Sequence, residues 1–324
     1  MKKTMPSMSP EQIDARYGFD PIITERVDGA IDQRAQWVKN LAGIAILKSG
    51  LLNTAIDEVY ERFVQYEQKV APRLKLDDYG EGTALDDDEL IVKNGSGPLA
   101  ASADHATDPI RKTSGVREGA DHGTAALAFA LHDDYQASIV LPRGRQTGNA
   151  NVDMMHPLKS SLSDLLPGKK GFLSIHGMRP GKFEHQFDPT EIHAVLGLGA
   201  EPTEVSQKAA RDIIEQVKEE HGLKVVVGNS ARFFDRGDTP RLERDDEGNL
   251  KYAPRLAAMG TGSTTNFVNN VTADSQMPAL QVELSRSLRL LPEDMEYRDP
   301  RARRLAVYMG YQLLKSISDG ILKL

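Results

Sequence analysis

From residue 98 onward, the sequence alternates short apolar runs with longer stretches of helical periodicity. The expected strands span 137–141, 171–176, 223–228 and 279–284, and the expected helices span 124–133, 203–221 and 300–318. We expect the last helix to begin after Asp299, with Pro300 in its first position, and to stop at Gly320. This order of elements predicts an α/β sandwich with helices on both faces of a sheet.

Two segments precede this α/β domain, which we place at residues 98–324. Between about Pro21 and Val70, apolar residues recur at helical spacing, and from Leu52 to Val70 they approach a heptad seam. This pattern predicts an N-terminal helical arm over residues 1–75, which either packs on its own domain or joins subunits of a homo-oligomer. Residues 76–97 hold the acidic run Asp86–Glu89 and a turn-rich end, and so predict an acidic linker.

Composition narrows the classes of function. The 324 residues include 40 Lys and Arg against 47 Asp and Glu, a net charge of −7, which argues against the basic surface that nucleic acid requires. No apolar run has the length of a membrane span, and no signal-peptide core follows the first lysines. We therefore expect a cytoplasmic protein with neither nucleic acid nor membrane as partner.

The lack of cysteine limits the chemistry further. Without cysteine there is no disulfide, thiol nucleophile or thiolate zinc site, so His, Asp and Glu are the remaining metal ligands. The sequence also lacks the Gly-x-Ser-x-Gly motif of one class of serine hydrolases and the His-Glu-x-x-His motif of thermolysin-like enzymes. Its glycine-rich stretches complete neither a dinucleotide fingerprint nor a P-loop.

Polar residues end or interrupt two of the expected strands. His176 ends the apolar run that starts at Gly171, which places an imidazole at the carboxyl edge of a buried strand, where α/β sheets carry their sites. Glu283 interrupts a second run, and alternation puts it on one face with Gln281. A buried carboxylate there requires a metal, a cation or a proton. Arg286 offers that cation, so a structural ion pair with Glu283 is one interpretation.

His105 and Asp121 lie in two further polar stretches. Asp121 directly precedes an expected helix, where a carboxylate can cap the helix N-terminus. With His105 and His176, it can instead form a set of three ligands for Zn²⁺ that leaves one position open for water. Glu283 would then take a proton from that water and pass it to a leaving amine. The sequence therefore indicates the parts of a metal-dependent hydrolase.

These stretches resemble the motifs of the N-formylglutamate amidohydrolase family, a member of the wider zinc carboxypeptidase-like group. The resemblance covers about residues 98–318 by the order and spacing of its motifs. The motifs are His105-Ala106-Thr107, Ile110-Arg111, Ala120-Asp121-x-Gly123-Thr124, Ile175-His176-Gly177-Met178 and Leu280-Gln281-Val282-Glu283-Leu284-Ser285-Arg286.

The resemblance implies a three-layer α/β sandwich, phosphorylase/hydrolase-like, with a mixed central sheet flanked by helices. It implies a zinc cofactor held by His105, Asp121 and His176, with Glu283 as the general base. Arg286 would orient Glu283 or bind a carboxylate of the substrate. The helical arm lies outside this resemblance.

Four more residues enter through the same resemblance. Arg111 is an alternative ligand for the substrate carboxylate, and Asn151 lies where such proteins carry an asparagine loop near the substrate. The segment between Arg111 and Asp121 is longer than usual in the family, so Glu118 or His122 could replace Asp121 as a metal ligand. A polar turn is the competing interpretation for the loop around Asn151.

The activity that the resemblance implies is cleavage of an amide in a small N-acyl amino acid, so the partner would be a small amide substrate that carries a carboxylate. A metallocarboxypeptidase or a poly-γ-glutamate hydrolase would share this chemistry. A different class of protein, a non-catalytic binding or scaffold relative, also fits, since the longer segment before Asp121 and the helical arm depart from the family pattern. One fold can host many chemistries.

Overall fold

The central feature of the structure is one mixed sheet. The computed structural model describes residues 51–70, 89–107, 109–110, 120–143, 146–147, 150, 156–177, 193–199, 203–221, 223–228, 252–253, 268, 277–285, 288–290 and 300–324. Among these residues, eight strands form a sheet in the order β1-β4-β2-β6-β10-β7-β8-β9. Their bounds are β1 Glu89–Lys93, β2 Leu99–Ser102, β4 Ser138–Arg143, β6 Gly171–Gly177, β7 Ala194–Gly197, β8 Val225–Gly228, β9 Tyr252–Ala253 and β10 Ala279–Leu284. A separate short pair joins β3 (Pro109–Ile110) to β5 (Gln146–Thr147).

The middle of the sheet is parallel and buried. Strands β4, β2, β6 and β10 run in the same direction, whereas β1 pairs antiparallel with β4 and β7 pairs antiparallel with β10. All residues of β6 and β10 are buried, as expected where helices cover both faces of a parallel sheet. The mixed sheet that the resemblance implied is therefore confirmed.

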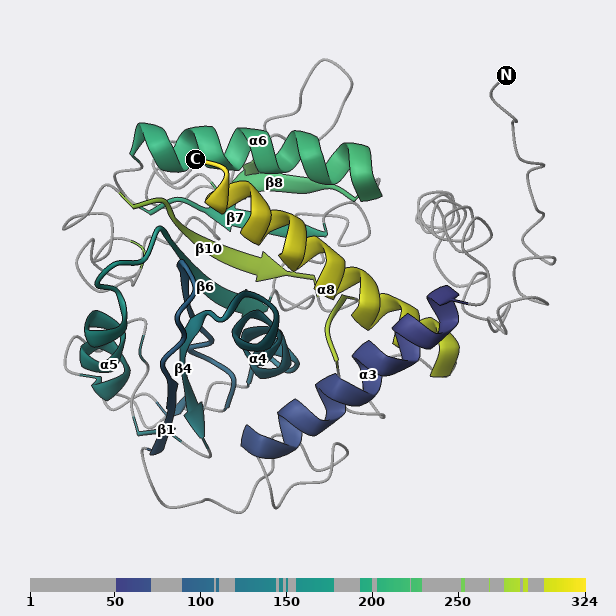
Figure 1. Ribbon diagram of the computed structural model, residues 1–324, viewed down its shortest axis with the longest axis horizontal. Helices are drawn as coiled ribbons and strands as arrows, with labels where there is room; N and C mark the ends of the chain where they lie inside the picture. Colours follow the sequence, from purple (N-terminus) through teal and green to yellow (C-terminus); the bar gives the residue numbers. More distant parts are fainter. Residues whose placement is uncertain are drawn as a thin grey trace, which may run out of the picture.

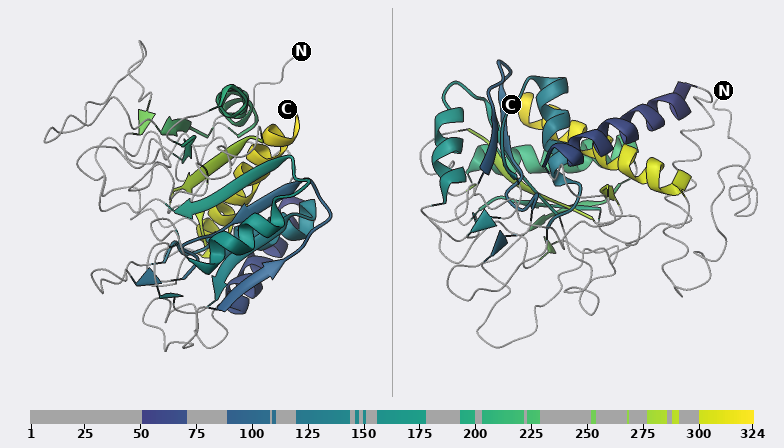
Figure 2. Two further views of the ribbon diagram at one scale, coloured as in Figure 1. Left: turned by 90° about the vertical axis from the view of Figure 1, so that its left-hand side faces the viewer. Right: turned by 90° about the horizontal axis from the view of Figure 1, so that it is seen from below.

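Helices lie on both sides of this sheet, which makes three layers (Figure 1, Figure 2). On one face, α4 (Thr124–Tyr135), α6 (Glu204–His221) and α8 (Pro300–Leu322) share a continuous apolar core with the strands. On the other face, α5 (Pro157–Leu165) packs in a second apolar cluster. The three-layer α/β sandwich is thus confirmed. None of the helices that the structure describes is both long and apolar enough to cross a membrane.

Alternation along β6 and β10 separates core from site. Leu173, Ile175, Leu280 and Val282 belong to the core with α4 and α8, whereas Phe172 packs with α5. The next residues on the α5 face of these strands are Ser174 and His176 in β6, and Gln281 and Glu283 in β10. The polar side chains are therefore on the same face of neighbouring strands, beyond the end of the apolar cluster.

The described part of the N-terminal arm packs on the domain itself. Helix α3 (Leu51–Val70) contacts α4 and α8. Its Phe63, Tyr66 and Val70 are at most 4% exposed, and the Phe63 ring meets Tyr311 of α8 edge to face. From Ile56 to Val70, the apolar seam expected from the sequence is thus covered within the chain. A homo-oligomer through the arm stays a prediction, and residues 1–50 lie outside the described residues.

Two local expectations were wrong. Residues 89–93, inside the expected linker, form the edge strand β1, because Leu90-Ile91-Val92 is an apolar, partly β-branched run that pairs with β4. Gly320 does not stop α8, which continues to Leu322. A Cβ at Gly320 would overlap the Ile213 side chain, so this glycine permits close packing of α6 on α8.

Candidate metal centre

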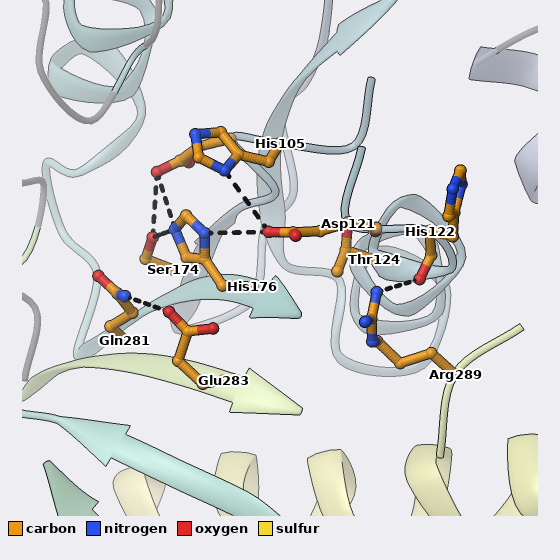
Figure 3. Close-up of polar contacts among 10 residues, drawn as sticks. His105, Asp121, His122, Thr124, Ser174, His176, Gln281, Glu283 and Arg289 are labelled. Carbon is orange, nitrogen blue, oxygen red and sulfur yellow. Dashed lines mark hydrogen bonds and ion pairs between the residues drawn. The ribbon is translucent and has the colours of Figure 1, made fainter. Parts of the chain in front are cut away.

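Three side chains from separate parts of the chain converge at one end of the parallel strands (Figure 3). His105, Asp121 and His176 each offer one ligand atom, and these atoms all lie within 4.8 Å of one another. Asp121 Oδ2 is 3.3 Å from His176 Nδ1 and 3.6 Å from His105 Nδ1. The two imidazole rings meet edge to face with centroids 5.1 Å apart. The structure thus brings together all three residues of the predicted ligand set.

The backbone explains why these residues meet. β2 runs parallel to β6 with Ser102 opposite Ser174, so the chain that leaves β2 carries His105 past the strand end next to His176. The amide of Asp121 donates a hydrogen bond of 2.7 Å to the carbonyl of His105. This bond joins the loop after β2 to the turn before α4.

The donor set suits a divalent transition metal. Two imidazole nitrogens and one carboxylate oxygen are ligands that zinc prefers, and three protein ligands leave one coordination position open, as in catalytic zinc sites. Mn²⁺, Fe²⁺ and Co²⁺ accept the same ligands. The His105, Asp121 and His176 side chains are 17%, 6% and 3% exposed, so a bound cation would be largely shielded from water. His105, Asp121 and His176 therefore form a group that could hold a metal ion.

The far side of the His176 ring contacts a carboxylate that the sequence analysis missed. Asp104 Oδ2 lies 3.3 Å from His176 Nε2, and Ser174 Oγ lies 3.1 Å from the same nitrogen. A carboxylate on one ring nitrogen orients the imidazole and leaves the other nitrogen for a metal. Ser174 shares a strand face with His176, so alternation could have found it, but Asp104 gave no signal besides its place next to His105.

The contacts of His176 with neighbouring carboxylates shift the pKa values of both His176 and Asp121. Burial disfavours ionisation of Asp121, but its hydrogen bonds to His105 and His176 outweigh this and hold the pKa of Asp121 well below its usual range. Burial alone would lower the pKa of His176, yet hydrogen bonds to Asp104 and Asp121 raise it well above its usual value. A metal ion and a proton therefore compete for His176 Nδ1.

Glu283 lies beside this group. In the parallel pairing of β10 with β6, Glu283 is the direct neighbour of His176 (Figure 3). Its Oε1 accepts a hydrogen bond of 2.6 Å from Gln281 Nε2. Burial raises the pKa of Glu283, and the nearby Asp121 charge adds to this effect, although His176 opposes it. A carboxylate whose pKa moves toward neutrality is suited to take up and release a proton.

The remaining candidates divide into two groups. Arg286, Arg111, Asn151 and Glu118 lie outside the described residues. The His122 ring points away from the three ligand side chains (Figure 3), and His122 is not part of their group. The capping role considered for Asp121 is wrong, because Gly123, with φ of 81°, occupies the N-cap position of α4. The Asp121 carboxylate instead faces His105 and His176.

Arg289 supports the turn that carries Asp121, and the sequence analysis did not single it out. Its Nη1 donates a hydrogen bond of 2.5 Å to the carbonyl of His122 (Figure 3). Its guanidinium also packs on Gly177, where a Cβ would overlap it. Arg289 is only 5% exposed, so it links the end of β6 to the turn before α4 from within the protein.

Comparison with known proteins finds similarity in three-dimensional structure. No model of a protein family matches the chain, and no curated protein sequence matches it. Among solved structures, a bacteriophage poly-γ-glutamate hydrolase is similar at 16% identity and a TM-score of 0.40, over 72% of this chain and 88% of that one.

Two further solved structures are similar to a comparable degree. An N-formylglutamate amidohydrolase from Ralstonia eutropha JMP134 has 12% identity and a TM-score of 0.44, over 72% of this chain and 100% of that one. A metallo-carboxypeptidase from Burkholderia cenocepacia has 13% identity and a TM-score of 0.40, over 82% of this chain and 68% of that one. Identities and TM-scores this low carry no information about activity, so the function of this chain has to be argued from its own site.

Proposed function

We propose that the protein is a metal-dependent amidohydrolase that uses zinc, related to the N-formylglutamate amidohydrolase family. One observation carries the proposal: the ligand atoms of His105, Asp121 and His176 lie within 4.8 Å of one another, and Glu283 is the strand neighbour of His176. Three ligands and an adjacent carboxylate are the protein groups that a metal-dependent enzyme uses to hydrolyse an amide.

His105, Asp121 and His176 would hold the cation, and Asp104 would fix the orientation of His176. When bound, zinc supplies the Lewis acidity that makes water nucleophilic near neutral pH. Glu283 accepts the proton that the attacking water loses. As the amide C–N bond breaks, the hydroxyl remains on the acyl carbon, and Glu283 delivers the proton to the departing amine nitrogen. Gln281 keeps Glu283 in place through its hydrogen bond.

We further propose that the substrate is a small N-acyl amino acid that carries a carboxylate. Arg286 and Arg111 are the side chains proposed to bind that carboxylate, and Asn151 is proposed to contact the amide. A metallocarboxypeptidase or a poly-γ-glutamate hydrolase would use the same four residues around the cation. Turnover of a series of substrates from N-formyl amino acids to γ-linked polymers separates these activities, because a closed pocket admits only the short members.

The test begins with the metal. Wild type purified without chelator should contain about one zinc per chain by elemental analysis, and His176→Ala should lose it. Glu283→Gln should keep the metal and lose hydrolysis of the best amide substrate, since the amide side chain cannot accept a proton. A Glu283→Gln variant with near wild-type turnover would show that the base is wrongly assigned.

A non-catalytic scaffold is the second candidate, and one observation favours it. The Asp104 and Asp121 carboxylates lie on opposite nitrogens of the His176 ring, each 3.3 Å away, so a protonated His176 can donate to both carboxylates and offset part of their charge without a metal. Wild type that takes up neither zinc nor cobalt on titration would establish this candidate over the hydrolase.

A further inference from the structure

Helix α3 buries a charged residue in its apolar face. Glu67 is 2% exposed and follows Phe63 and Tyr66 on the side of α3 that packs on the domain. Burying an ionised carboxylate costs several kcal/mol unless hydrogen bonds or opposite charges compensate. A buried hydrogen bond to Glu67 therefore indicates why a carboxylate lies at this position.

Glu67 caps a helix that belongs to the metal centre. Its Oε1 accepts a hydrogen bond of 2.8 Å from the backbone amide of Ala126, 59 residues later in the chain. Ala126 is the third residue of α4, and the amides of a first helical turn have no acceptor within the helix. The N-cap residue of α4 is Gly123, which has no side chain for capping. A carboxylate at this position also interacts favourably with the helix dipole.

The capped turn is continuous with the ligand Asp121. Both the amide and the hydroxyl of Thr124, the first residue of α4, donate to the carbonyl of Asp121, at 3.2 and 2.7 Å. The first turn of α4 and the backbone of Asp121 are thus tied together, and a shift of one moves the other. Asp121 Oδ2 lies between the two histidines, so a small displacement changes its distance to both.

From these contacts we infer that Glu67 is a positioning residue for Asp121, and that α3 is through it a working part of the metal centre. The inference rests on the proposed metal site. The acceptor on α3 holds the first turn of α4 in the place where Asp121 meets His105 and His176. Helix α3 belongs to the N-terminal arm, which the resemblance to the N-formylglutamate amidohydrolase family left unexplained, and it then has a function in setting metal affinity.

The test compares Glu67→Ala with a control on the same helix. Val59→Ala also removes a buried group from the α3 packing face, but it lies eight residues earlier, about 12 Å along the helix axis. Both variants should melt at lower temperature than wild type. Titration with Co²⁺ should give about tenfold weaker binding and an altered visible absorption spectrum for Glu67→Ala, whereas Val59→Ala should match wild type.

Glu67→Gln provides a second, milder variant in case Glu67→Ala folds poorly. The glutamine keeps an oxygen that can accept from Ala126, so cobalt affinity and spectrum should return most of the way to wild type. Cobalt binding by Glu67→Ala that equals wild type overturns the inference. Equal weakening in Val59→Ala also overturns it, because general loosening of α3 would then be the cause.

Hydrogen exchange separates this inference from the proposed function. Without added metal, Glu67→Ala should speed exchange of the amides at the start of α4 relative to wild type and Val59→Ala. If wild type binds no cobalt, the proposed metal site fails, and the exchange measurement decides the remaining claim. Unchanged exchange in Glu67→Ala would then refute positioning of this turn by Glu67.

Discussion

Replacing Asp104 by asparagine should weaken metal binding without touching a ligand. Asp104 Oδ2 lies 3.3 Å from His176 Nε2, and both side chains are at most 3% exposed. When His176 binds a metal through Nδ1, its ring is neutral and Nε2 carries a proton, so Asp104 accepts a charge-assisted hydrogen bond worth about 1.5–3 kcal/mol. The net loss should therefore resemble that of other carboxylates behind histidine ligands, about 10- to 100-fold in affinity. This range corresponds to about 1.4–2.7 kcal/mol.

The assay is calorimetric titration of zinc into wild type and Asp104→Asn over a range of pH. Asp104 also helps to raise the pKa of His176, so its loss eases competition by protons. The full difference should therefore appear at alkaline pH, where His176 is neutral in both proteins, and should shrink as the pH falls. Ser174→Ala, which removes the neutral partner of the same nitrogen, should cost less than Asp104→Asn. Equal zinc affinity of Asp104→Asn and wild type at alkaline pH would refute the orienting role of Asp104.

Three further predictions concern proton release on zinc binding and the packing of α3 and α8. Below the raised pKa of His176, the apparent Kd for zinc should rise about tenfold for each unit that the pH falls, because one proton leaves as the metal binds. Calorimetry in buffers of different ionisation enthalpy counts that proton, and a pH-independent Kd would contradict the prediction. Phe63→Ala should lower the free energy of unfolding, measured by urea titration, by about 3–5 kcal/mol, because Phe63 is 1% exposed in the contact of α3 with α8. A loss under about 1 kcal/mol would mean that α3 does not pack there. Gly310→Ala should destabilise the protein by about 1–3 kcal/mol, although alanine has the better helix propensity, because the new Cβ overlaps the Leu288 carbonyl. An unchanged midpoint of urea unfolding would be inconsistent with that packing.

Much of the domain could be read from local patterns. The expected strands at 137–141, 171–176, 223–228 and 279–284 correspond to β4, β6, β8 and β10, and the three expected helices correspond to α4, α6 and α8. The strands β2 and β7 were not expected, because each has only four residues, too few for a periodicity that distinguishes a strand from a piece of helix. The continuation of α8 through Gly320 was not expected, because a glycine near the end of a helical pattern is typical of a helix C-terminus. In the structure, the glycine instead makes room for the Ile213 side chain.

Local sequence patterns indicated the types of ligand and the places of His176 and Glu283 on their strands. The lack of cysteine left His, Asp and Glu as ligand types. The end of the apolar run 171–176 put His176 at the carboxyl edge of a strand, and alternation put Glu283 on one face with Gln281, which the structure confirms as polar. Both are local properties, because a side chain's direction along a strand depends on its immediate neighbours.

The support of these groups depends on contacts between elements that are far apart in the sequence. The register that sets Glu283 beside His176, the contact of Asp104 with the far nitrogen of His176 and the cap that Glu67 provides for α4 all join residues distant in sequence. No periodicity encodes such contacts, because they form when separate elements pack together and buried polar groups need partners. The long-range packing of α3, β2, β6 and β10 therefore decides the geometry of the site, whose ligand types the sequence had already indicated.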